Sequence, residues 1–407
     1  MDKSAFLRSM EEAVVPGVAR PAAGSGLAAV AIASNIVSPL GFTTRANYEA
    51  VRQGRSGLKR QCGTWGLPEP FMASLICREA VLAECENEGI SGSFTFFERM
   101  AMLSVLKTVR QCEVDVTSDR ILLILSTTKG NVDMLRTPVE GVGEERLLLG
   151  EAARAIAGGL GLASRPVVVS NACISGVCAQ IEASRLLAAG RYDYVIVCGI
   201  DVLSPFIVSG FQSLKALTDE PCRPFDEDRT GINLGDAAAT IIYKGVAADQ
   251  LPRGSWAMVR SAIRNDAFHI SSPSRQGEGS YRALRLVLQG EPLDDIAFVS
   301  AHGTATLFND EMESVAIDRA GLGQTPVNSL KGYYGHTMGA AGVLESILSM
   351  EAVDDGVILP TRGFETLGVS RRINVVAKEE HTDKKAFVKM MSGFGGCNAA
   401  ILFRKND

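Results

Sequence analysis

The stretch Val167-Val-Val-Ser-Asn-Ala-Cys-Ile-Ser-Gly176 places a cysteine where strand-forming residues give way to small ones. Val167 to Val169 suit a buried strand, and residues 177–187 carry apolar side chains at helical spacing. We therefore expect Cys173 at or near the start of a helix, where unpaired N–H groups stabilise a thiolate and lower its pKa. Packing and metal ligation stay open at this point, because a free cysteine is often simply buried.

Strand and helix patterns alternate through the first part of the chain around this stretch. Strands are predicted at 27–36, 120–125, 167–169 and 192–199, and helices at 44–52, 96–111, 145–157 and 177–187. Strand, helix and strand in succession indicate a mainly parallel sheet that helices cover on both faces.

A second series of the same kind begins near Ser255. Strands are predicted at 297–300, 385–391 and 399–403, and helices at 312–320 and 343–353, while residues 326–329 lead into a glycine-rich loop. We expect two similar α/β halves, 25–250 and 251–407, although no short repeat is visible. Residues 1–24 are predicted to be an N-terminal extension, with an amphipathic helix from Ser4 to Val15.

The composition of the chain narrows the class of protein. Its 407 residues are 46% hydrophobic and carry a net charge of −5, which supplies no basic stripe for nucleic acid. Nine scattered cysteines without a C-x-x-C pair fit neither a disulfide framework nor a zinc site, and favour reduced thiols in a cytoplasm. The apolar segment from Gly26 to Val37 is too short to span a membrane, so we expect a cytoplasmic protein.

Two of the four histidines lie in loops where a catalytic role is favoured. His302 and His336 stand among glycines and threonines at predicted strand-to-helix junctions, where side chains can point into a shared cleft. A thiolate with two neutral imidazoles suits acyl transfer through a thioester, because the imidazoles can hydrogen-bond to a developing negative charge on oxygen. A hydrolase would also need a cysteine and a histidine, but two histidines suit stabilisation of an enolate better than hydrolysis. The alternative without a catalytic role is that both are hydrogen-bonded structural histidines.

Several motifs in matching order resemble the β-ketoacyl-[acyl-carrier-protein] synthases, in the elongating Cys-His-His branch of the thiolase superfamily. They are Asn171-Ala-Cys-Ile-Ser-Gly176, His302-Gly-Thr-Ala-Thr306, Lys331 with Gly335-His-Thr-Met-Gly-Ala-Ala-Gly342, and Gly393-Phe-Gly-Gly-Cys-Asn398. The resemblance runs over about residues 27 to 404. It implies a thiolase-like fold, in which two similar α/β halves form a layered αβαβα architecture.

The resemblance also implies roles for the central residues. Cys173 is the nucleophile that becomes acylated. His302 and His336 bind the malonyl thioester carbonyl and stabilise the enolate that forms as carbon dioxide leaves. Lys331 fixes the electrostatics of the site, with Glu313 as its expected ion partner. The implied reaction is a decarboxylative Claisen condensation in fatty-acid or related polyketide and polyene synthesis.

Outer residues and partners follow from the same resemblance. Thr304 and Thr306 are expected to line the pantetheine channel. Phe394 is expected to gate the acyl pocket, and its N–H group completes an oxyanion hole with that of Cys173. The implied partner is an acyl-carrier protein whose phosphopantetheine carries the substrates, without a resident metal, nucleotide or flavin. A homodimer is implied, and a heterodimer stays open.

Four positions depart from the usual pattern of the family: Ser392, Cys397, Ile174 and Asp236. The length and shape of the preferred acyl chain therefore stay undetermined, because residues that line the acyl pocket can differ while the catalytic residues are the same. Cys397 raises the alternative of a degradative thiolase, in which a second cysteine acts as a base, but the other motifs argue against it. A non-catalytic partner resembling a chain-length factor is the other alternative, although such proteins typically lack the nucleophile.

Overall fold

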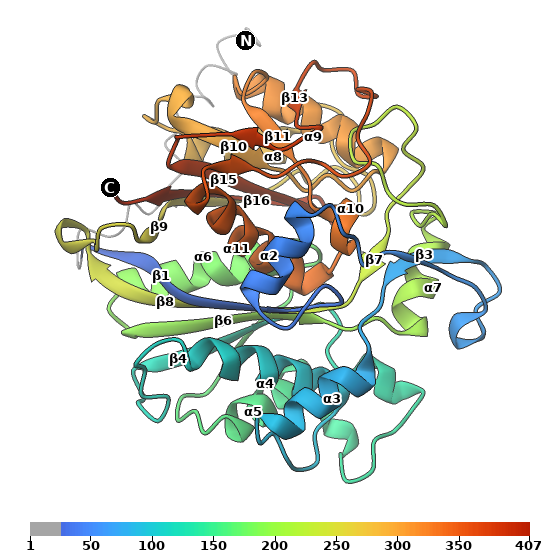
Figure 1. The fold of residues 1–407 in the computed structure, drawn as a ribbon, viewed down its shortest axis with the longest axis vertical. Coiled ribbons are helices and arrows are strands. Elements are labelled where there is room, and N and C mark those ends of the chain that lie inside the picture. Colours follow the sequence, from blue (N-terminus) through green and yellow to red (C-terminus); the bar gives the residue numbers. More distant parts are fainter. Residues whose placement is uncertain (1–25) are drawn as a thin grey trace, which may run out of the picture.

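The computed structural model describes residues 26–407, and these form alternating layers of helices and sheets (Figure 1). The predicted extension 1–24 with its amphipathic helix lies outside the described residues. The strands of the main sheet are β1 (Leu27–Val37), β4 (Ile121–Ser126), β5 (Val167–Val169), β6 (Tyr194–Asp201), β8 (Ala237–Ala247), β9 (Trp256–Asn265), β10 (Ile296–Ser300), β11 (Pro326–Asn328), β13 (Asn374–Val375), β15 (Ala386–Gly393) and β16 (Cys397–Lys405).

The main sheet consists of two sets of strands with the same order and direction. In the first set the order is β1-β8-β6-β4-β5, and in the second β9-β16-β15-β10-β11, to which β13 adds an edge. In each set the first two pairings are antiparallel and the next two are parallel. A short antiparallel pairing of β1 with β9 joins the sets into an 11-stranded sheet. The prediction of two similar α/β halves is thereby confirmed, whereas the prediction of a mainly parallel sheet is wrong, because five of the ten pairings are antiparallel.

Helices complete the layers on either side of these strands. They are α2 (Thr44–Arg52), α3 (Arg78–Asn87), α4 (Phe96–Val109), α5 (Leu149–Gly159), α6 (Ser175–Ala188), α7 (Pro205–Ser213), α8 (Glu278–Val287), α9 (Leu307–Arg319), α10 (Lys331–Tyr334) and α11 (Ala341–Asp354). Helices α3, α4 and α5 cover the outside of the first strand set, and α8 and α9 cover the outside of the second (Figure 1). Helices α6 and α11 lie between the two sets, which gives the expected αβαβα architecture.

Short strands outside the main sheet complete the secondary structure. They are β2 (Lys59–Gln61), β3 (Phe71–Ser74) and β7 (Leu234–Gly235) in one small sheet, and β12 (Val357–Ile358) with β14 (Glu380–His381) in another. The first of these sheets packs beside α7 at one side of the molecule (Figure 1).

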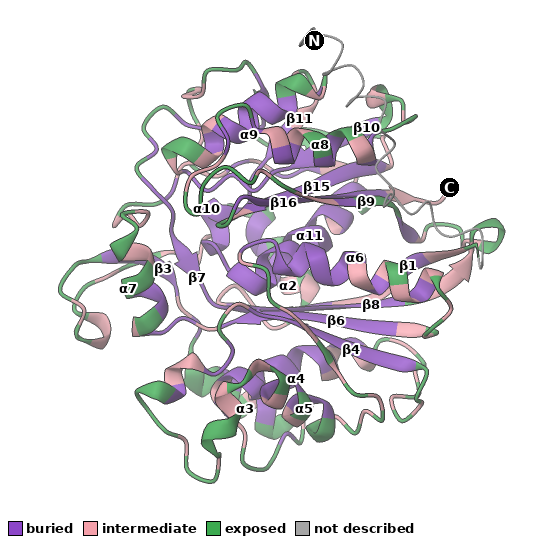
Figure 2. Cartoon of the chain, turned by 180° about the vertical axis from the view of Figure 1, so that it is seen from behind, coloured by how far each residue is buried: buried purple, intermediate pink, exposed green. Residues whose placement is uncertain are grey.

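The central position of α6 and α11 explains their composition. Strands cover both sides of α11, so nearly all of its residues are buried (Figure 2). Gly176 and Gly342 allow the two helices to approach each other closely. A Cβ atom on Gly176 would lie 2.9 Å from the Gly339 carbonyl oxygen, and one on Gly342 would lie 2.7 Å from the Val177 nitrogen. This close approach brings the loop before α6 to the loop before α11.

A buried carboxylate also ties the two strand sets together. Asp201, at the end of β6, accepts hydrogen bonds from the N–H groups of Thr128, Lys129 and Gly339 and from the hydroxyls of Thr127 and Thr128. Gly339 precedes α11 in the second half, whereas the threonines follow β4 in the first. Asp201 therefore fixes the ends of two parallel strands against the loop that carries His336.

Candidate active site

Cys173 lies in the tight turn between β5 and α6. Ala172 adopts a positive φ of 44°, and the Ser175 hydroxyl donates to the Ala172 carbonyl oxygen while it accepts from the Asn171 N–H. Helix α6 begins at Ser175, with Ile174 as its N-terminal cap. The prediction that Cys173 stands at a helix start is confirmed, and its side chain is buried.

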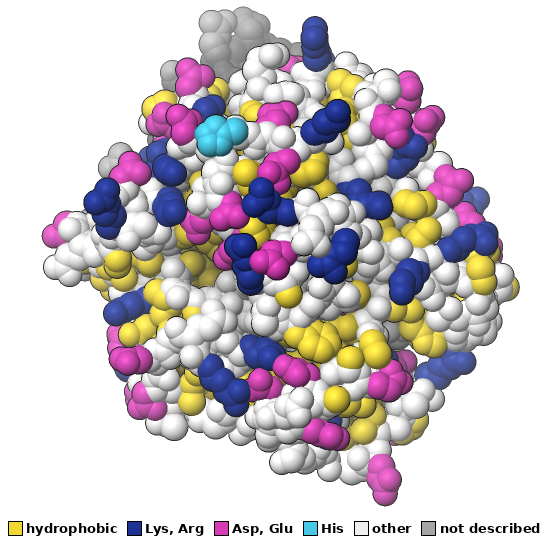
Figure 3. Space-filling model, viewed as in Figure 1, with side chains coloured by type: hydrophobic (Ala, Val, Ile, Leu, Met, Phe, Trp, Pro, Cys, Tyr) yellow, Lys and Arg dark blue, Asp and Glu magenta, His cyan; other side chains and the backbone are white. Residues whose placement is uncertain are grey.

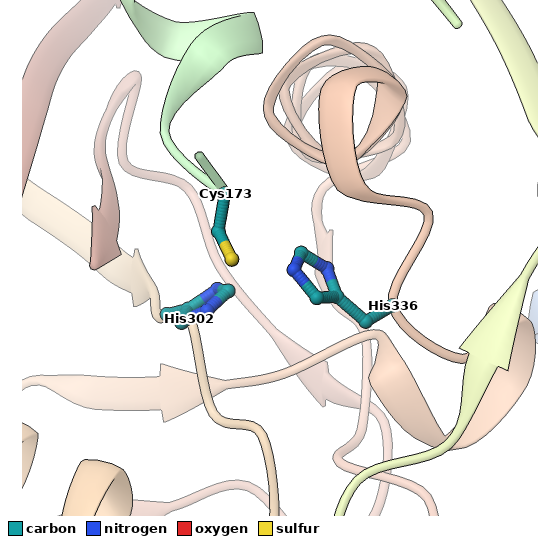
Figure 4. A group of neighbouring side chains, drawn as sticks. All are labelled: Cys173, His302 and His336. Carbon is teal, nitrogen blue, oxygen red and sulfur yellow. The ribbon is translucent and has the colours of Figure 1, made fainter. Parts of the chain in front are cut away.

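His302 and His336 reach the same point from the second half. His302 follows β10, and His336 lies between α10 and a short helical turn before α11; both are buried. Their ring centroids are 5.0 Å apart, with an interplanar angle of 79°. The sulfur of Cys173 and one ring nitrogen of each histidine all lie within 4.8 Å of one another. Figure 4 shows the three side chains converging from separate loops.

The histidine rings have unused hydrogen-bonding atoms. Within residues 26–407, Nδ1 of His302 and both ring nitrogens of His336 are buried without a hydrogen-bond partner. Buried polar atoms normally find partners, so such atoms at one point need an explanation. A substrate oxygen placed between the rings would satisfy them.

Both imidazoles are held in the neutral form. Burial lowers the pKa of His302 and of His336 well below 6.5, and the positive charges of Lys331 and Lys389 lower both pKa values further. A neutral imidazole has one N–H group and one nitrogen that accepts a proton. The pair can therefore donate hydrogen bonds to an anionic oxygen, or accept the proton of a thiol, near pH 7.

The expectation of a lowered pKa for the Cys173 thiol is wrong for the substrate-free protein. Burial raises the pKa of Cys173 to about 11, which outweighs the lowering effects of Lys331, of the Phe394 N–H group and of Lys129. The helix start therefore does not by itself supply a thiolate at neutral pH. The thiol has to lose its proton as it reacts, and the adjacent neutral imidazoles can accept it.

The raised pKa predicts how Cys173 reacts with an alkylating agent. Because the thiolate reacts and its fraction grows tenfold per pH unit below the pKa, the alkylation rate should rise about tenfold per unit from pH 7 to 9. We would follow the peptide that contains Cys173 by mass spectrometry after timed exposure to iodoacetamide. The exposed Cys62 and Cys77 in the same digest provide the comparison. A rate that levels off by pH 8 would show that burial does not control this thiol.

Glu313 holds the backbone of the His302 loop and is not the ion partner of Lys331. Its carboxylate accepts from the N–H groups of His302 at 2.7 Å and Gly303 at 2.6 Å. The Lys331 ammonium group pairs instead with Glu345 on α11. The predicted ion pair fails because Glu313 faces the loop, where backbone N–H groups occupy its oxygens. Burial raises the pKa of Glu313 to about 7, and nearby Asp310 adds to the effect.

Asp310 anchors the other end of the same loop. One of its oxygens accepts from the Thr304 N–H, and the other from the N–H groups of Ala305 and Phe225. With Glu313 one helical turn further along α9, two carboxylates thus bind successive N–H groups of the loop that presents His302.

Glu345 and Lys389 belong to the site but were not predicted from the sequence. Lys389 on β15 is fully buried, and its ammonium group contacts Glu345 Oε2 at 2.5 Å. Each residue is a single charge inside an otherwise apolar segment, which is a signal that a buried partner is needed. Only the three-dimensional structure shows that Glu345 lies between two lysines.

The predicted channel and gate residues differ in their exposure. The hydroxyls of Thr304 and Thr306 lie 2.9 Å apart, and Thr304 is buried whereas Thr306 is partly accessible. Phe394 is 38% exposed, and its ring centroid lies 6.1 Å from that of Phe211 on α7. The Phe394 N–H group has a lowering effect on the pKa of the Cys173 thiol.

The four unusual positions have defined surroundings. The Cys397 thiol donates to the Phe394 carbonyl oxygen at 3.2 Å, and the Ser392 hydroxyl contacts Asn398 at 2.8 Å. Asp236 accepts from the N–H groups of Ile76 and Leu203, and Ile174 is fully buried.

The donor set of Cys173, His302 and His336 consists of sulfur and imidazole nitrogen, which zinc prefers. The buried charges beside it disfavour a cation, because Lys331 and Lys389 share one carboxylate, that of Glu345.

Positive and negative side chains are interspersed over the face of the molecule in Figure 3. In residues 26–407 we find no helix that is long and apolar enough to cross a membrane.

Comparisons with known proteins agree with this geometry. The family description "Beta-ketoacyl synthase, N-terminal domain" matches residues 128–247, and "Beta-ketoacyl synthase, C-terminal domain" matches residues 257–365. The chain is 32% identical to 3-oxoacyl-[acyl-carrier-protein] synthase 2 of Rhizobium meliloti over 58% of its own length and 60% of that protein. It is 27% identical to the protein of the same name from Vibrio cholerae, over 91% of this chain and 97% of that one.

Solved structures share the fold. A β-ketoacyl synthase from Burkholderia phymatum superimposes with a TM-score of 0.81 at 23% identity, covering 94% of this chain and all of that one. A ketosynthase in complex with its chain length factor from Xenorhabdus doucetiae gives 0.79 at 22% identity, covering 93% and 98%. A type II polyketide ketosynthase in complex with its acyl-carrier protein gives 0.78 at 19%, covering 93% and 99%. Because both family domains match in order and together cover more than half of its residues, the chain belongs to the β-ketoacyl synthase family of condensing enzymes.

Proposed function

We propose that this enzyme joins an acyl group held on Cys173 to malonyl-acyl-carrier protein by decarboxylative Claisen condensation, giving β-ketoacyl-acyl-carrier protein. The observation that carries the proposal is the convergence of one thiol and two neutral imidazoles within 4.8 Å, with unused ring nitrogens. A thiol can store the acyl group, and paired N–H donors can stabilise an enolate.

Acylation is the first proposed step. Sγ of Cys173 attacks the carbonyl carbon of the acyl thioester while an adjacent imidazole accepts the thiol proton. The N–H groups of Cys173 and Phe394 stabilise the oxyanion of the tetrahedral intermediate. The C–S bond to the carrier then breaks, and the carrier thiolate leaves with the proton from the imidazole.

Condensation is the second proposed step. His302 and His336 donate N–H groups to the thioester carbonyl oxygen of the malonyl group. The bond to the carboxylate breaks, carbon dioxide leaves, and the electron pair becomes the enolate that the two donors stabilise. Its carbon attacks the acyl carbonyl on Cys173, a C–C bond forms, and the C–S bond breaks. The Cys173 thiolate then takes up a proton.

The remaining site residues support these steps. Lys331 fixes the electrostatics of the histidine pair, Thr304 and Thr306 line the pantetheine channel, and Phe394 gates the passage to the acyl pocket. The thiol, imidazoles and N–H groups supply the nucleophile, the base and the donors, so we propose no resident cofactor. The substrates arrive on the phosphopantetheine of an acyl-carrier protein.

We further propose that the enzyme is cytoplasmic and forms a homodimer through β5. Strand β5 is at one edge of the main sheet, and Val167 on it is exposed. An edge strand presents unpaired N–H and C=O groups that the same strand of a second copy can bind. A heterodimer with a chain-length-factor-like subunit is the second possibility, because one structural neighbour is a ketosynthase with such a partner. Native mass spectrometry distinguishes the two assemblies.

A reconstitution experiment tests the reaction. The purified enzyme is incubated with a panel of acyl-carrier proteins bearing different acyl chains, and the mass added at Cys173 is measured. Malonyl-acyl-carrier protein is then added, and carbon dioxide and β-ketoacyl product are quantified. Equal amounts of both products would support the proposal, and the preferred chain would indicate fatty-acid or polyketide synthesis. Acylation that depends on coenzyme A, without carbon dioxide release, would instead indicate a thiolase.

A further inference from the structure

The buried lysine Lys389 is held by four acceptors, three at the carboxyl end of β10 and one on α11. Its Nζ lies 3.2 Å from the Ser300 carbonyl oxygen, 3.3 Å from the Ser300 hydroxyl, 3.1 Å from the Ala301 carbonyl oxygen and 2.5 Å from Glu345 Oε2. A buried ammonium group is costly unless it is paired and hydrogen-bonded. Burial lowers the pKa of Lys389, and the carboxylate of Glu345 opposes this effect, so the contacts favour the charged form without exposing it to water.

The contacts of Lys389 fix the start of the His302 loop. Ala301 directly precedes His302, and the peptide group between them is held from both sides: Lys389 binds its carbonyl oxygen, while Glu313 binds its N–H group and the N–H group of Gly303. The Ser329 hydroxyl donates to the Gly303 carbonyl oxygen at 2.7 Å. His302 is thus positioned from three different elements.

The charges around Lys389 do not balance. Lys331 and Lys389 pair with the two oxygens of a single carboxylate, Glu345, which leaves one positive charge in excess. Burial raises the pKa of Glu345, but the two lysines outweigh this effect and keep it ionised. The other titratable groups beside this cluster are Glu313 on α9, with its pKa of about 7, the two neutral histidines, and the buried thiols of Cys173 and Cys222.

We propose that Lys389 is a positioning residue for the condensation half-reaction, which anchors Glu345 and the His302 loop and supplies the excess positive charge beside the histidine pair. The inference rests on the proposed function. An enolate forming between the rings is the anion that this charge stabilises. The same charge keeps the imidazoles neutral, so that they do not protonate the carbanion before it attacks the acyl group.

The test uses two variants that remove the charge in different ways. Lys389→Met leaves Lys331 and Glu345 as a balanced pair, and Lys389→Gln also retains an amide that can donate to the Ser300 and Ala301 carbonyl oxygens. Lys384→Met is the matched control, because Lys384 also donates to a β10 carbonyl, that of Ile296, but is not paired with Glu345. Circular dichroism and thermal unfolding verify that each variant is folded.

Acylation and condensation are measured separately between pH 5 and 9. We expect carbon dioxide release from the acylated enzyme to fall roughly 10- to 100-fold in both Lys389 variants, because the His302 loop is misplaced, with acylation changed less than about threefold. Because loss of the charge raises the pKa of both histidines, the acid limb of condensation should move to higher pH. Lys384→Met should behave as the wild type.

Specific results would overturn the assignment of Lys389. Folded variants with wild-type condensation and an unmoved acid limb would do so, as would equal loss of both steps. Failure of both variants to fold would leave Lys389 a purely structural residue. An inactive wild-type enzyme would instead overturn the proposed function, so the two failures can be told apart.

Discussion

Replacing Cys173 with alanine is expected to abolish acyl-enzyme formation and to reduce condensation by on the order of 10⁴-fold or more, as for other enzymes that lose their nucleophile. Without Sγ no covalent bond to the acyl group can form, and the enolate has no acyl thioester beside it to attack. Intact-protein mass spectrometry after incubation with acyl-acyl-carrier protein measures the first effect. Product formation from malonyl-acyl-carrier protein measures the second.

Cys178→Ala is the matched control for the nucleophile. Cys178 is a buried thiol on α6, the helix that follows Cys173, and its sulfur lies 3.8 Å from the Asn171 amide nitrogen. This variant should still gain the acyl mass. If the Cys173→Ala protein were still acylated, the nucleophile would have to be another of the nine cysteines and the proposed mechanism would fail.

Replacing either His302 or His336 with alanine is expected to reduce condensation by about 10² to 10³-fold, because each change removes one hydrogen-bond donor from the enolate oxygen. Acylation should be reduced less, since the oxyanion of that step binds the N–H groups of Cys173 and Phe394, and the remaining imidazole can still accept the thiol proton. Single-turnover experiments with labelled malonyl-acyl-carrier protein give the rate of carbon dioxide release. Mass spectrometry gives the rate of acylation on the same samples.

Two further variants sharpen the histidine experiment. His381→Ala serves as the control, because His381 is exposed on β14, and both steps should stay unchanged. His336→Asn retains an N–H donor and should recover part of the condensation rate. Equal loss of acylation and condensation in the alanine variants would contradict the division of roles between Cys173 and the histidines.

Local sequence patterns predicted most of the framework around the site. The continuous apolar run at 121–125 is a strand buried on both faces. The valines at 167–169 form the strand before the nucleophile, but this edge strand is partly exposed and not buried as expected. Cys173, His302 and His336 were placed in the correct loops, because small residues and glycines mark the turns where strands end. The convergence of the three side chains could be inferred from the shared edge of parallel strands. The distances between them could not be inferred from the sequence.

The errors arose where tertiary contacts outweigh local pattern. Helix α9 begins at Leu307 and not near residue 312, because its first turn exposes Leu307 and Phe308 and buries Asp310. The helix predicted at 145–157 is interrupted at Leu148, before α5. Glu313 was assigned to Lys331 from the resemblance to the family, whereas burial and backbone N–H groups decide its actual partners.

The raised pKa of Cys173 is a further property that local sequence does not predict. A helix start favours a thiolate, and that effect is visible in the sequence, but the depth of burial is not. Burial depends on how α6, α11 and the Phe394 loop close over the thiol, which are contacts between residues far apart in the chain. The pKa values of buried groups can therefore be predicted only from the folded structure.

The repeated strand order has a consequence for how the enzyme can fail. The first strand set carries the thiol and the second carries both imidazoles, so neither repeat contains a complete reaction centre. Near the site, the glycine contact of α6 with α11 and the Asp201 hydrogen bonds link the two halves. A substitution at Gly176 or Asp201 can therefore leave each half folded and still move the acylated Cys173 thiol away from the two histidines that stabilise the carbanion.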